Sequence, residues 1–420
     1  MIGGTELFVK SIAAEQSKLG HIVIIALPNI EDSEIWESQQ SIQLFKFSNP
    51  NGINSKNISS GKQSPVHIEK WLIWLKEQKP DILHVHAFEP FAYWFIKVAK
   101  ELGINVFITP HVTQFTCSTG LLLLNGISQC DGFVENARCT NCAIYRKYER
   151  KKNKYLFFLF YKYIYVSYKI VRSIIRGKRI SRYNNVESKL QMLHQVKNIT
   201  DKFIVLTNDY KQKLLINNFR DKQIEVVKYK AGDKFEYNAV SQNNIFKVAL
   251  IGRLSLEKGA HVLLKSLDKI DTSNYKVEVH LFGRSHEDFP ALDEAIRKIN
   301  NTSVRVFKHG VVESDVLEKK LKDIDLLCIP STVYEMSPLV IQEAFTAGIP
   351  IVGSNIGGIA EYVKDENNGL LFEIGDDESL AVALNRVIND KPLYESLRNN
   401  IQRSLGFSQV AIDFIKIYEK

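Results

Sequence analysis

Residues 334–350 read YEMSPLVIQEAFTAGIP and contain two glutamates eight positions apart, Glu335 and Glu343. Apolar runs at 326–329 and 349–353 flank this stretch, which predicts a strand, a helix and a second strand. Glu335 then follows the first strand, and Glu343 lies about two turns into the helix. Carboxylates placed there can receive the hydroxyl groups of a sugar or a ribose. Two glutamates at this spacing also occur on solvated helix faces, so the pair alone leaves both interpretations open.

Strands and helices alternate in the same way along most of the chain. In the first half, apolar runs at 21–27, 82–86 and 105–109 are separated by stretches with helical periodicity. The alternation is interrupted, resumes at 204–206, and begins a second series at 246. Helices between continuous apolar strands indicate βαβ units and parallel sheets. The sequence therefore predicts an α/β protein with two Rossmann-like, doubly wound domains.

Domain boundaries follow from a polar stretch without periodicity, which we interpret as a linker. We assign residues 1–235 to an amino-terminal domain and residues 236–400 to a carboxy-terminal domain. Residues 401–420 are expected to form a helix that crosses back to the first domain, which itself carries an insert at about 112–195. Two such domains normally bind their ligand in the cleft between them, at the carboxyl ends of the strands.

Composition places the chain among ordinary globular proteins. Its 420 residues exceed a single core, and 45% hydrophobic with 24% charged residues excludes disordered, collagenous and coiled-coil chains. No apolar run approaches the roughly 18 residues of a membrane-spanning helix. The residues after Met1 show no secretory signal pattern, so we expect a cytoplasmic protein whose cysteines are thiols or metal ligands.

The net charge of +8 is concentrated in one segment. Residues 143–183 hold thirteen lysines and arginines and a single acid, so this segment carries +12 and the rest of the chain −4. It also contains the aromatic run 155–161, and this combination suits an interfacial helix on an anionic membrane. A helical insert with a solvated basic face is the alternative. RNA binding is disfavoured because no stacking motif accompanies the charge, so no nucleic-acid partner is expected.

The glutamate stretch and its neighbours together resemble the signature of the retaining glycosyltransferases of family 4, which have the GT-B fold. The two glutamates are followed by A-x-x-A-G-x-P at 344–350. Residues 251–259, IGRLSLEKG, resemble the GR-x(3)-EKG loop of the family, and residues 281–283, LFG, resemble its strand end. Further family positions occur in the expected order, namely Pro330-Ser331, Gly357-Gly358-x-x-Glu361 and Asn368-Gly369-Leu370-Leu371.

The resemblance implies that the carboxy-terminal domain, 236–400, binds a nucleotide-sugar donor and that the amino-terminal domain, 1–235, is on the acceptor side. Arg253 offers a planar fork and Lys258 a point charge to phosphate oxygens. Gly252 and the helix start at Gly357 and Gly358 let backbone amides approach the phosphates. Because such groups replace a metal ion in the family, no catalytic metal is expected.

The resemblance also implies roles for residues beyond the phosphates. Glu343 would bind the ribose hydroxyls, and Glu335 would sit beside the transferred sugar. His111 aligns with the strand-end histidine that meets the donor sugar or the acceptor; a hydrogen-bonded structural histidine is the alternative. Gly3 and Gly4 resemble the glycine loop that faces the donor phosphates and the acceptor.

Two features of the amino-terminal domain qualify this picture. The glycine loop of the family normally follows a first β-strand, whereas this chain begins at the loop. We therefore expect either that residues upstream of Met1 supply the strand or that the sheet lacks its first central strand. Of the two histidines on the run 82–86, His86 is expected to line the cleft and His84 to have a buried structural role.

Four of the five cysteines lie in the insert and form C-x12-C-x8-C-x2-C, at Cys117, Cys130, Cys139 and Cys142. A C-x2-C pair can grip a tetrahedral ion, and two more thiolates complete a closed structural zinc site. A subset of family 4 enzymes carries a similar insert. The spacings are not those of a standard finger, so an iron–sulfur cluster and free thiols stay open alternatives. Cys328 lies in an apolar strand and is expected in the core.

These observations predict a cytoplasmic hexosyltransferase at the inner face of the cell membrane. It would move a sugar, with retention, from a nucleotide-diphosphate-sugar donor to a saccharide or lipid-linked acceptor in cell-surface polysaccharide or glycolipid synthesis. A nucleotide-sugar epimerase is one alternative. An inactive or truncated relative that acts as a binding partner is the other.

Overall fold

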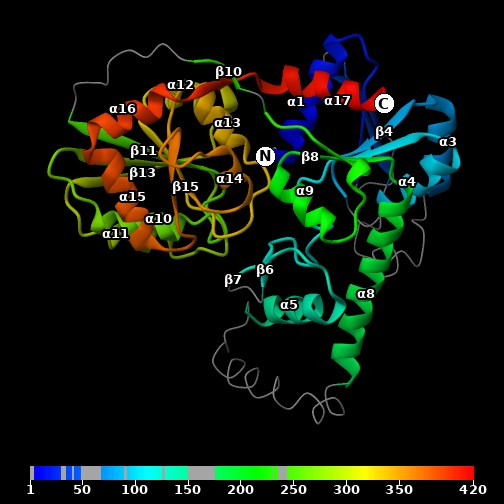
Figure 1. The fold of residues 1–420 in the computed structure, drawn as a ribbon, viewed down its shortest axis with the longest axis horizontal. Helices are drawn as coiled ribbons and strands as arrows, with labels where there is room; N and C mark the ends of the chain where they lie inside the picture. Colours follow the sequence, from blue (N-terminus) through cyan, green and yellow to red (C-terminus); the bar gives the residue numbers. More distant parts are fainter. Residues whose placement is uncertain are drawn as a thin grey trace. The chain divides into compact units, whose positions relative to one another are not determined.

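The computed structural model describes residues 4–29, 35–39, 42–48, 68–88, 92–124, 128–149, 176–229, 231–234 and 244–420. The chain forms two compact units (Figure 1). The first consists of Met1–Val227 and Ala411–Lys420, and the second of Lys228–Val410. The division falls inside the last helix, α17 (Gly406–Tyr418).

The first unit contains a parallel sheet of four strands in the order β4-β5-β8-β9. A second sheet has the order β1-β3-β2, with β1 parallel and β2 antiparallel to β3. The strands are β1 (Ile24–Asn29), β2 (Ile35–Gln39), β3 (Ile42–Ser48), β4 (Ile82–Val85), β5 (Asn105–Ile108), β8 (Lys202–Val205) and β9 (Ile224–Val226). Within the described ranges, β1 and β4 each pair on one edge only.

Amphipathic helices accompany these sheets. α4 (Ala92–Glu101) buries Phe95, Ile96 and Ala99, which recur at the spacing of one helix face. α1 (Gly4–Lys18) likewise buries Phe8 and Ile12. The other helical segments of the unit are α3 (Ile68–Gln78), α5 (Asn136–Glu149), α8 (Arg176–Ile199), α9 (Asn208–Leu215) and the 3-10 turn η2 (Asp221–Gln223).

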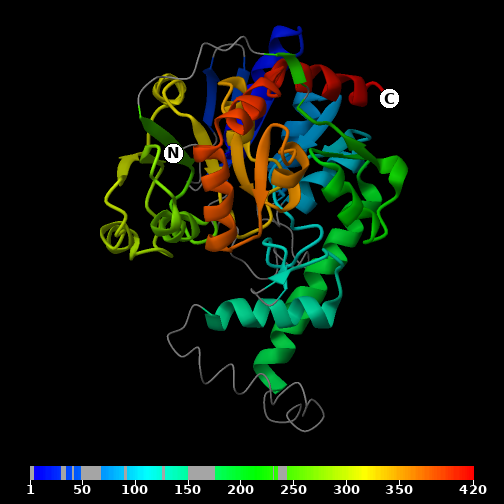
Figure 2. The ribbon, with the colours of Figure 1, turned by 60° about the vertical axis from the view of Figure 1, so that its left-hand side comes forward.

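The predicted insert is only partly described. A short hairpin of β6 (Leu123–Leu124) and β7 (Ser128–Gln129) precedes α5, and α5 packs against α8 (Figure 2). Residues 150–175, with the aromatic run and much of the basic charge, lie outside the described part of the chain. Among the helices that are described, none combines the length and apolar character needed to cross a bilayer.

The second unit is built on a parallel sheet of six strands in the order β13-β12-β11-β14-β15-β16. The strands are β11 (Ile245–Ile251), β12 (Lys276–Phe282), β13 (Val304–Gly310), β14 (Leu326–Ile329), β15 (Ile351–Ser354) and β16 (Gly369–Phe372). Strands added after β11 extend the sheet on one side, and those from β14 onward extend it on the other. Ligands of such sheets bind at this reversal, outside the carboxyl ends of the strands.

Helices between these strands complete a doubly wound α/β unit. They are α10 (Ala260–Ser266), η3 (Leu267–Lys269), α11 (Leu292–Arg297), α12 (Ser314–Leu321), α13 (Leu339–Thr346), α14 (Gly357–Tyr362), α15 (Asp377–Asn389) and α16 (Lys391–Asn399). The predicted α/β fold with parallel sheets is thus confirmed.

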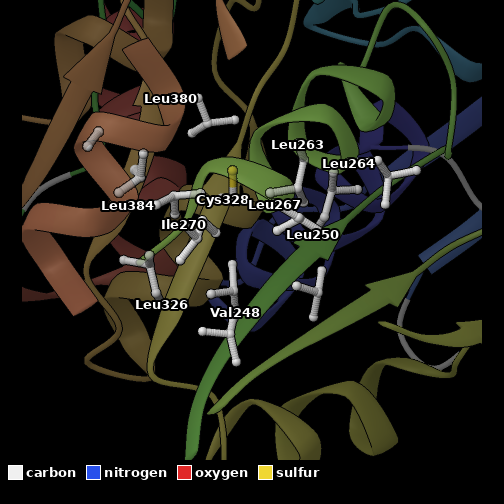
Figure 3. Close-up of a cluster of buried hydrophobic side chains, with 14 of the residues drawn as sticks. Val248, Leu250, Leu263, Leu264, Leu267, Ile270, Leu326, Cys328, Leu380 and Leu384 are labelled. Carbon is white, nitrogen blue, oxygen red and sulfur yellow. The ribbon is translucent and has the colours of Figure 1, made fainter. Parts of the chain in front are cut away.

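One face of the six-stranded sheet carries a dense apolar core (Figure 3). Alternate residues of β11, Val248 and Leu250, point into it together with Leu326 of β14 and Leu384 of α15. Cys328 lies in the same cluster at 1% exposure, so its assignment to the core is confirmed.

The predicted helix at 401–420 is wrong at its start. Residues Gln402–Ser404 form β17, which pairs antiparallel with β10 (Ala231–Lys234), and the helix begins only at Gly406. Gly406 has φ 67°, a conformation that glycine adopts without strain, and its N–H donates to Ser404 Oγ at 3.2 Å. The strand pairing and this turn delay the helix by five residues.

Candidate functional site

The loops after β11 and β14 meet at the carboxyl edge of the second unit's sheet. Thr332 donates from its backbone N–H to Glu257 O and from Oγ1 to Leu256 O, both at 2.9 Å. Gly259 has φ 73°, and a Cβ there would lie 1.6 Å from the carbonyl oxygen of Pro330. Only glycine permits this approach, which holds the two loops together.

Lys258 and Glu335 form an ion pair across these loops. Lys258 Nζ lies 2.5 Å from Glu335 Oε1, and Ser331 Oγ donates to the same oxygen at 2.8 Å. The side chains of Lys258 and Glu335 are 29% and 14% exposed, and Ser331 is buried. Partial burial strengthens the attraction relative to a surface pair. The fold thus brings together a cation and a carboxylate that the sequence analysis placed at the phosphates and at the sugar.

The backbone of Glu335 is also fixed by a hydrogen bond. Gly358, near the start of α14, donates its N–H to Glu335 O at 2.7 Å. A Cβ on Gly358 would lie 1.9 Å from Met336 O, so no larger residue fits there. Gly357 begins α14, and Gly252 directly follows β11. Glu335, Gly252, Gly357 and Gly358 all lie at the carboxyl ends of strands or in the segments that directly follow them.

Arg253 stands on the loop after β11 with an exposed guanidinium. In the described part of the chain, its nearest carboxylate is Glu257, at 3.9 Å. This long contact leaves its planar fork able to receive an anionic group.

Glu343 lies on α13 and is partly buried, and this burial raises the pKa of its carboxyl. Within the described ranges, no hydrogen bond or ion pair reaches the carboxylate, which is unfavourable for a buried acid unless a ligand supplies a partner. Burial, the Tyr362 phenol and the Glu343 carboxylate raise the pKa of Tyr229. The buried Tyr229 hydroxyl has no hydrogen-bond partner in the same part of the chain. No motif or periodicity pointed to Tyr229, which is far from Glu343 along the chain.

Three histidines gather at the carboxyl ends of β4 and β5 in the first unit. His86 Nδ1 lies 3.1 Å from His111 Nε2. Both ring nitrogens of His84 are occupied, by Tyr418 OH at 2.5 Å and Thr109 Oγ1 at 2.8 Å, which fits its expected structural role. The pairing of His86 with His111 was not foreseen.

Burial keeps these three rings neutral at pH 7. It lowers the pKa of His111 to about 4 and, with His111 as a second cause, that of His84 to about 3. Burial together with His84 and His111 holds the pKa of His86 well below its ordinary value. The strand ends of this unit therefore present uncharged donors and acceptors.

The predicted glycine loop lies at the boundary of the described residues. Gly3 lies outside the described residues, and Gly4 is the first residue of α1. Thr5 and Glu6 therefore belong to a helix, in which Glu6 occupies the favourable first turn.

The four cysteines of the insert lie on either side of a short hairpin. Cys117 accepts a hydrogen bond from Leu122 N at 3.4 Å, and Cys130 lies 3.6 Å from an Arg138 nitrogen. Cys139 and Cys142 are buried on α5. No three histidine, cysteine or acidic side chains of the described ranges stand close enough to hold a metal ion as placed.

Comparisons with known proteins agree over both units. The family described as glycosyl transferases group 1 matches residues 233–404, and the one described as Glycosyltransferase Family 4 matches residues 2–184. Together the two matches span most of the chain.

Individual relatives are more distant. An uncharacterized glycosyltransferase of Methanocaldococcus jannaschii is 26% identical over 219 residues, which is 51% of this chain and 55% of that protein. The Escherichia coli UDP-Gal:alpha-D-GlcNAc-diphosphoundecaprenol alpha-1,3-galactosyltransferase is 41% identical over 100 residues, or 23% of this chain and 25% of that one. The chain thus matches about half the length of the first of these curated relatives and less of the second.

A solved structure extends the likeness to the whole fold. HepE from Anabaena, crystallised in complex with UDP, superposes with a TM-score of 0.62 at 15% identity, covering 99% of this chain and 97% of that one. At this level of identity the agreement concerns the fold alone.

Proposed function

The chain belongs to the GT-B glycosyltransferases of family 4, and from this premise we propose that it transfers a sugar from a nucleotide-diphosphate-sugar donor to a saccharide or lipid-linked acceptor. The observation that carries the proposal is the assembly of Lys258, Glu335 and Ser331 at the strand ends where the sheet order reverses. The unpaired Glu343 carboxylate supports it further, because a ribose hydroxyl would give this acid a hydrogen-bond donor.

The proposed reaction breaks the bond between the anomeric carbon and the phosphate oxygen. The diphosphate leaves with the electron pair, while the acceptor hydroxyl bonds to the same carbon and loses its proton. We propose that this occurs with retention. Lys258 and Arg253 would stabilise the growing negative charge on the phosphates. Ser331 would keep Glu335 in place while the Lys258 ammonium interacts with the donor phosphates as well as with Glu335.

A lipid-linked acceptor and attachment to the inner face of the cell membrane form the next part of the proposal. The printed name of the E. coli relative specifies a diphosphoundecaprenol-linked sugar. In this chain, the +12 segment at 143–183 would attract an anionic surface at about 1 kcal/mol per basic residue before screening. Flotation with anionic and neutral liposomes tests this. Arg150, Lys151, Lys152 and Lys154, all changed to Ser, should reduce binding to the anionic ones, and equal flotation of both proteins would exclude the attachment.

A structural zinc ion is a separate proposal, supported by four thiols in one insert, three of them buried. Their side chains would have to turn toward one another to bind it, because no three are close enough as placed. Elemental analysis of the purified protein should find about one zinc per chain. Cys142→Ser should lose it, and Cys328→Ala in the core of the second unit should keep it. Iron with sulfide, or no metal, would reject zinc.

The central experiment compares Glu343→Gln with Glu395→Gln, an exposed glutamate of the same unit. Binding of UDP, ADP and GDP is first followed by thermal shift, and the matching nucleotide sugars are then offered with and without a saccharide or lipid-linked acceptor. Transfer that falls about 10- to 100-fold in Glu343→Gln alone supports the proposal. Isomerised donor without transfer would identify an epimerase. Binding without turnover would favour an inactive relative.

A further inference from the structure

We infer that His86 is a positioning residue for His111, and that the two imidazoles form a coupled pair of matching tautomers whose outer nitrogens, one donor and one acceptor, suit a saccharide hydroxyl. The inference rests on the proposed function, in which His111 meets the donor sugar or the acceptor. It adds a residue and a type of recognition that neither the motifs nor the comparisons supply.

The hydrogen bond between the rings restricts where their protons can be. His86 Nδ1 and His111 Nε2 are 3.1 Å apart, so one nitrogen carries the proton and the other accepts it. If His86 donates, neutral His111 must carry its own proton on Nδ1. If His111 donates, its Nδ1 is an acceptor and His86 Nε2 carries a proton. Either way, the two outer nitrogens offer one donor and one acceptor.

Those outer nitrogens are available for a ligand. Among the described residues, no hydrogen bond reaches His86 Nε2 or His111 Nδ1. A hydroxyl group both donates and accepts. The two roles exchange when the proton between the rings crosses over, the donating outer nitrogen gives its proton to the hydroxyl oxygen, and the hydroxyl proton passes to the other outer nitrogen, so that both rings stay neutral. A sugar hydroxyl can therefore be met in either orientation without a charged group.

Neighbouring rings hold His86 in place. Its ring centroid lies 4.1 Å from that of His84 and 6.4 Å from that of Phe414 on α17. On α1, Phe8 meets His111 edge to face at 4.8 Å. His86 is confined by this packing and passes its orientation to His111 through the hydrogen bond.

The surroundings of the pair favour neutral rings. The titratable groups that face it are His84 on β4 and, beyond His84, Tyr418 on α17. No carboxylate of the described residues pairs with either ring. Without a nearby anion, a buried imidazolium has nothing to offset its lost hydration.

The first test is the ¹⁵N–¹H NMR spectrum of the histidine rings in the unaltered full chain. The His86 and His111 resonances should show the same neutral tautomer, either Nδ1–H in both rings or Nε2–H in both, and it should persist from pH 8 to pH 5.5. Opposite tautomers in the two rings, or either ring protonated at pH 7, would overturn the inference. This result is independent of any activity, so failure of the proposed function would not affect it.

Two variants test the positioning role. His86→Leu removes the hydrogen bond, and His86→Gln offers an amide in its place. His86→Leu should give His111 mixed tautomers and a kcat about tenfold lower, with the donor KM within about twofold. His86→Gln should restore much of kcat. If His86→Leu leaves the His111 spectrum and kcat unchanged, or if folded His86→Gln restores neither, His86 has no positioning role.

Discussion

At the strand ends of the second unit an ammonium and a carboxylate contact each other directly, whereas at the strand ends of the first unit neutral imidazoles contact one another. Both arrangements sit at the same structural position, the carboxyl edge of a parallel sheet. The difference lies in what each can stabilise. Charged groups suit a diphosphate that gains negative charge as it leaves, while neutral donors and acceptors suit hydroxyl groups.

The largest expected effect comes from removing the cation. Lys258→Ala should lower transfer by about 10²- to 10³-fold, because it removes charge stabilisation of the leaving diphosphate and leaves Glu335 without its ion pair. Lys298→Ala, which removes an exposed lysine of the same unit, should leave turnover unchanged. Equal activity of the two variants, measured on an identified donor, would show that the charged pair of the second unit does not contribute to transfer.

Acid should destabilise the first unit, because its buried histidine His84 is neutral in the folded chain. The pKa of His84 is lowered from 6.5 to about 3, so below about pH 6.5 the unfolded chain binds a proton that the folded one does not. The contribution of His84 to the free energy of unfolding is therefore fully present above about pH 6.5 and is lost as the pH falls toward 3. For His84 alone the loss at pH 5 is about 2 kcal/mol.

Tryptophan fluorescence isolates this effect, because every tryptophan of the chain lies in the first unit: Trp36, Trp71, Trp74 and Trp94. The free energy of unfolding, measured with denaturant at pH 7 and pH 5, should fall less on acidification in His84→Gln than in the unaltered protein. Thr109→Val removes a hydrogen-bond partner of His84 but keeps the imidazole. Its free energy of unfolding should fall between pH 7 and pH 5 as much as that of the unaltered protein. A pH dependence unaltered by His84→Gln would contradict the assignment.

The smallest expected effect concerns the hydroxyl that holds Glu335. Ser331→Ala should lower kcat about fivefold to tenfold and leave the donor KM nearly unchanged, since it removes one hydrogen bond from a neutral hydroxyl to the carboxylate, while the ion pair with Lys258 remains. Thr332→Ser keeps the neighbouring hydroxyl and should behave as the unaltered protein. A rise in KM without a fall in kcat would place Ser331 in donor binding instead.

The two units also differ in how much the sequence could predict. In the second unit, continuous apolar strands and closely spaced motifs fixed both the parallel sheet and the loops that carry Lys258 and Glu335. Their contact still spans 77 positions and depends on the reversal of strand order, which periodicity does not encode. Ser331 matched a family position, but nothing local showed that its hydroxyl would hold Glu335.

The first unit was less accessible to prediction. Strands β2 and β3 escaped notice because residues 35–48 mix polar and apolar side chains. The pairing of His86 with His111 follows from the parallel register of β4 with β5, which places Val85 opposite Ile108. The sequence suggested both strands but not their register. Tyr229 escaped because only folding brings it to Glu343.

The discontinuous first unit has a consequence for protein synthesis. Its segment Ala411–Lys420 follows the whole of the second unit along the chain. That segment contributes Phe414, which is fully buried, and Tyr418, which contacts His84. A ribosome therefore makes most of the first unit before the second unit and the segment Ala411–Lys420 after it, so the second unit can fold while the first is still incomplete. Until Ala411–Lys420 has been made, the apolar surface of the first unit that Phe414 covers stays open to chaperones.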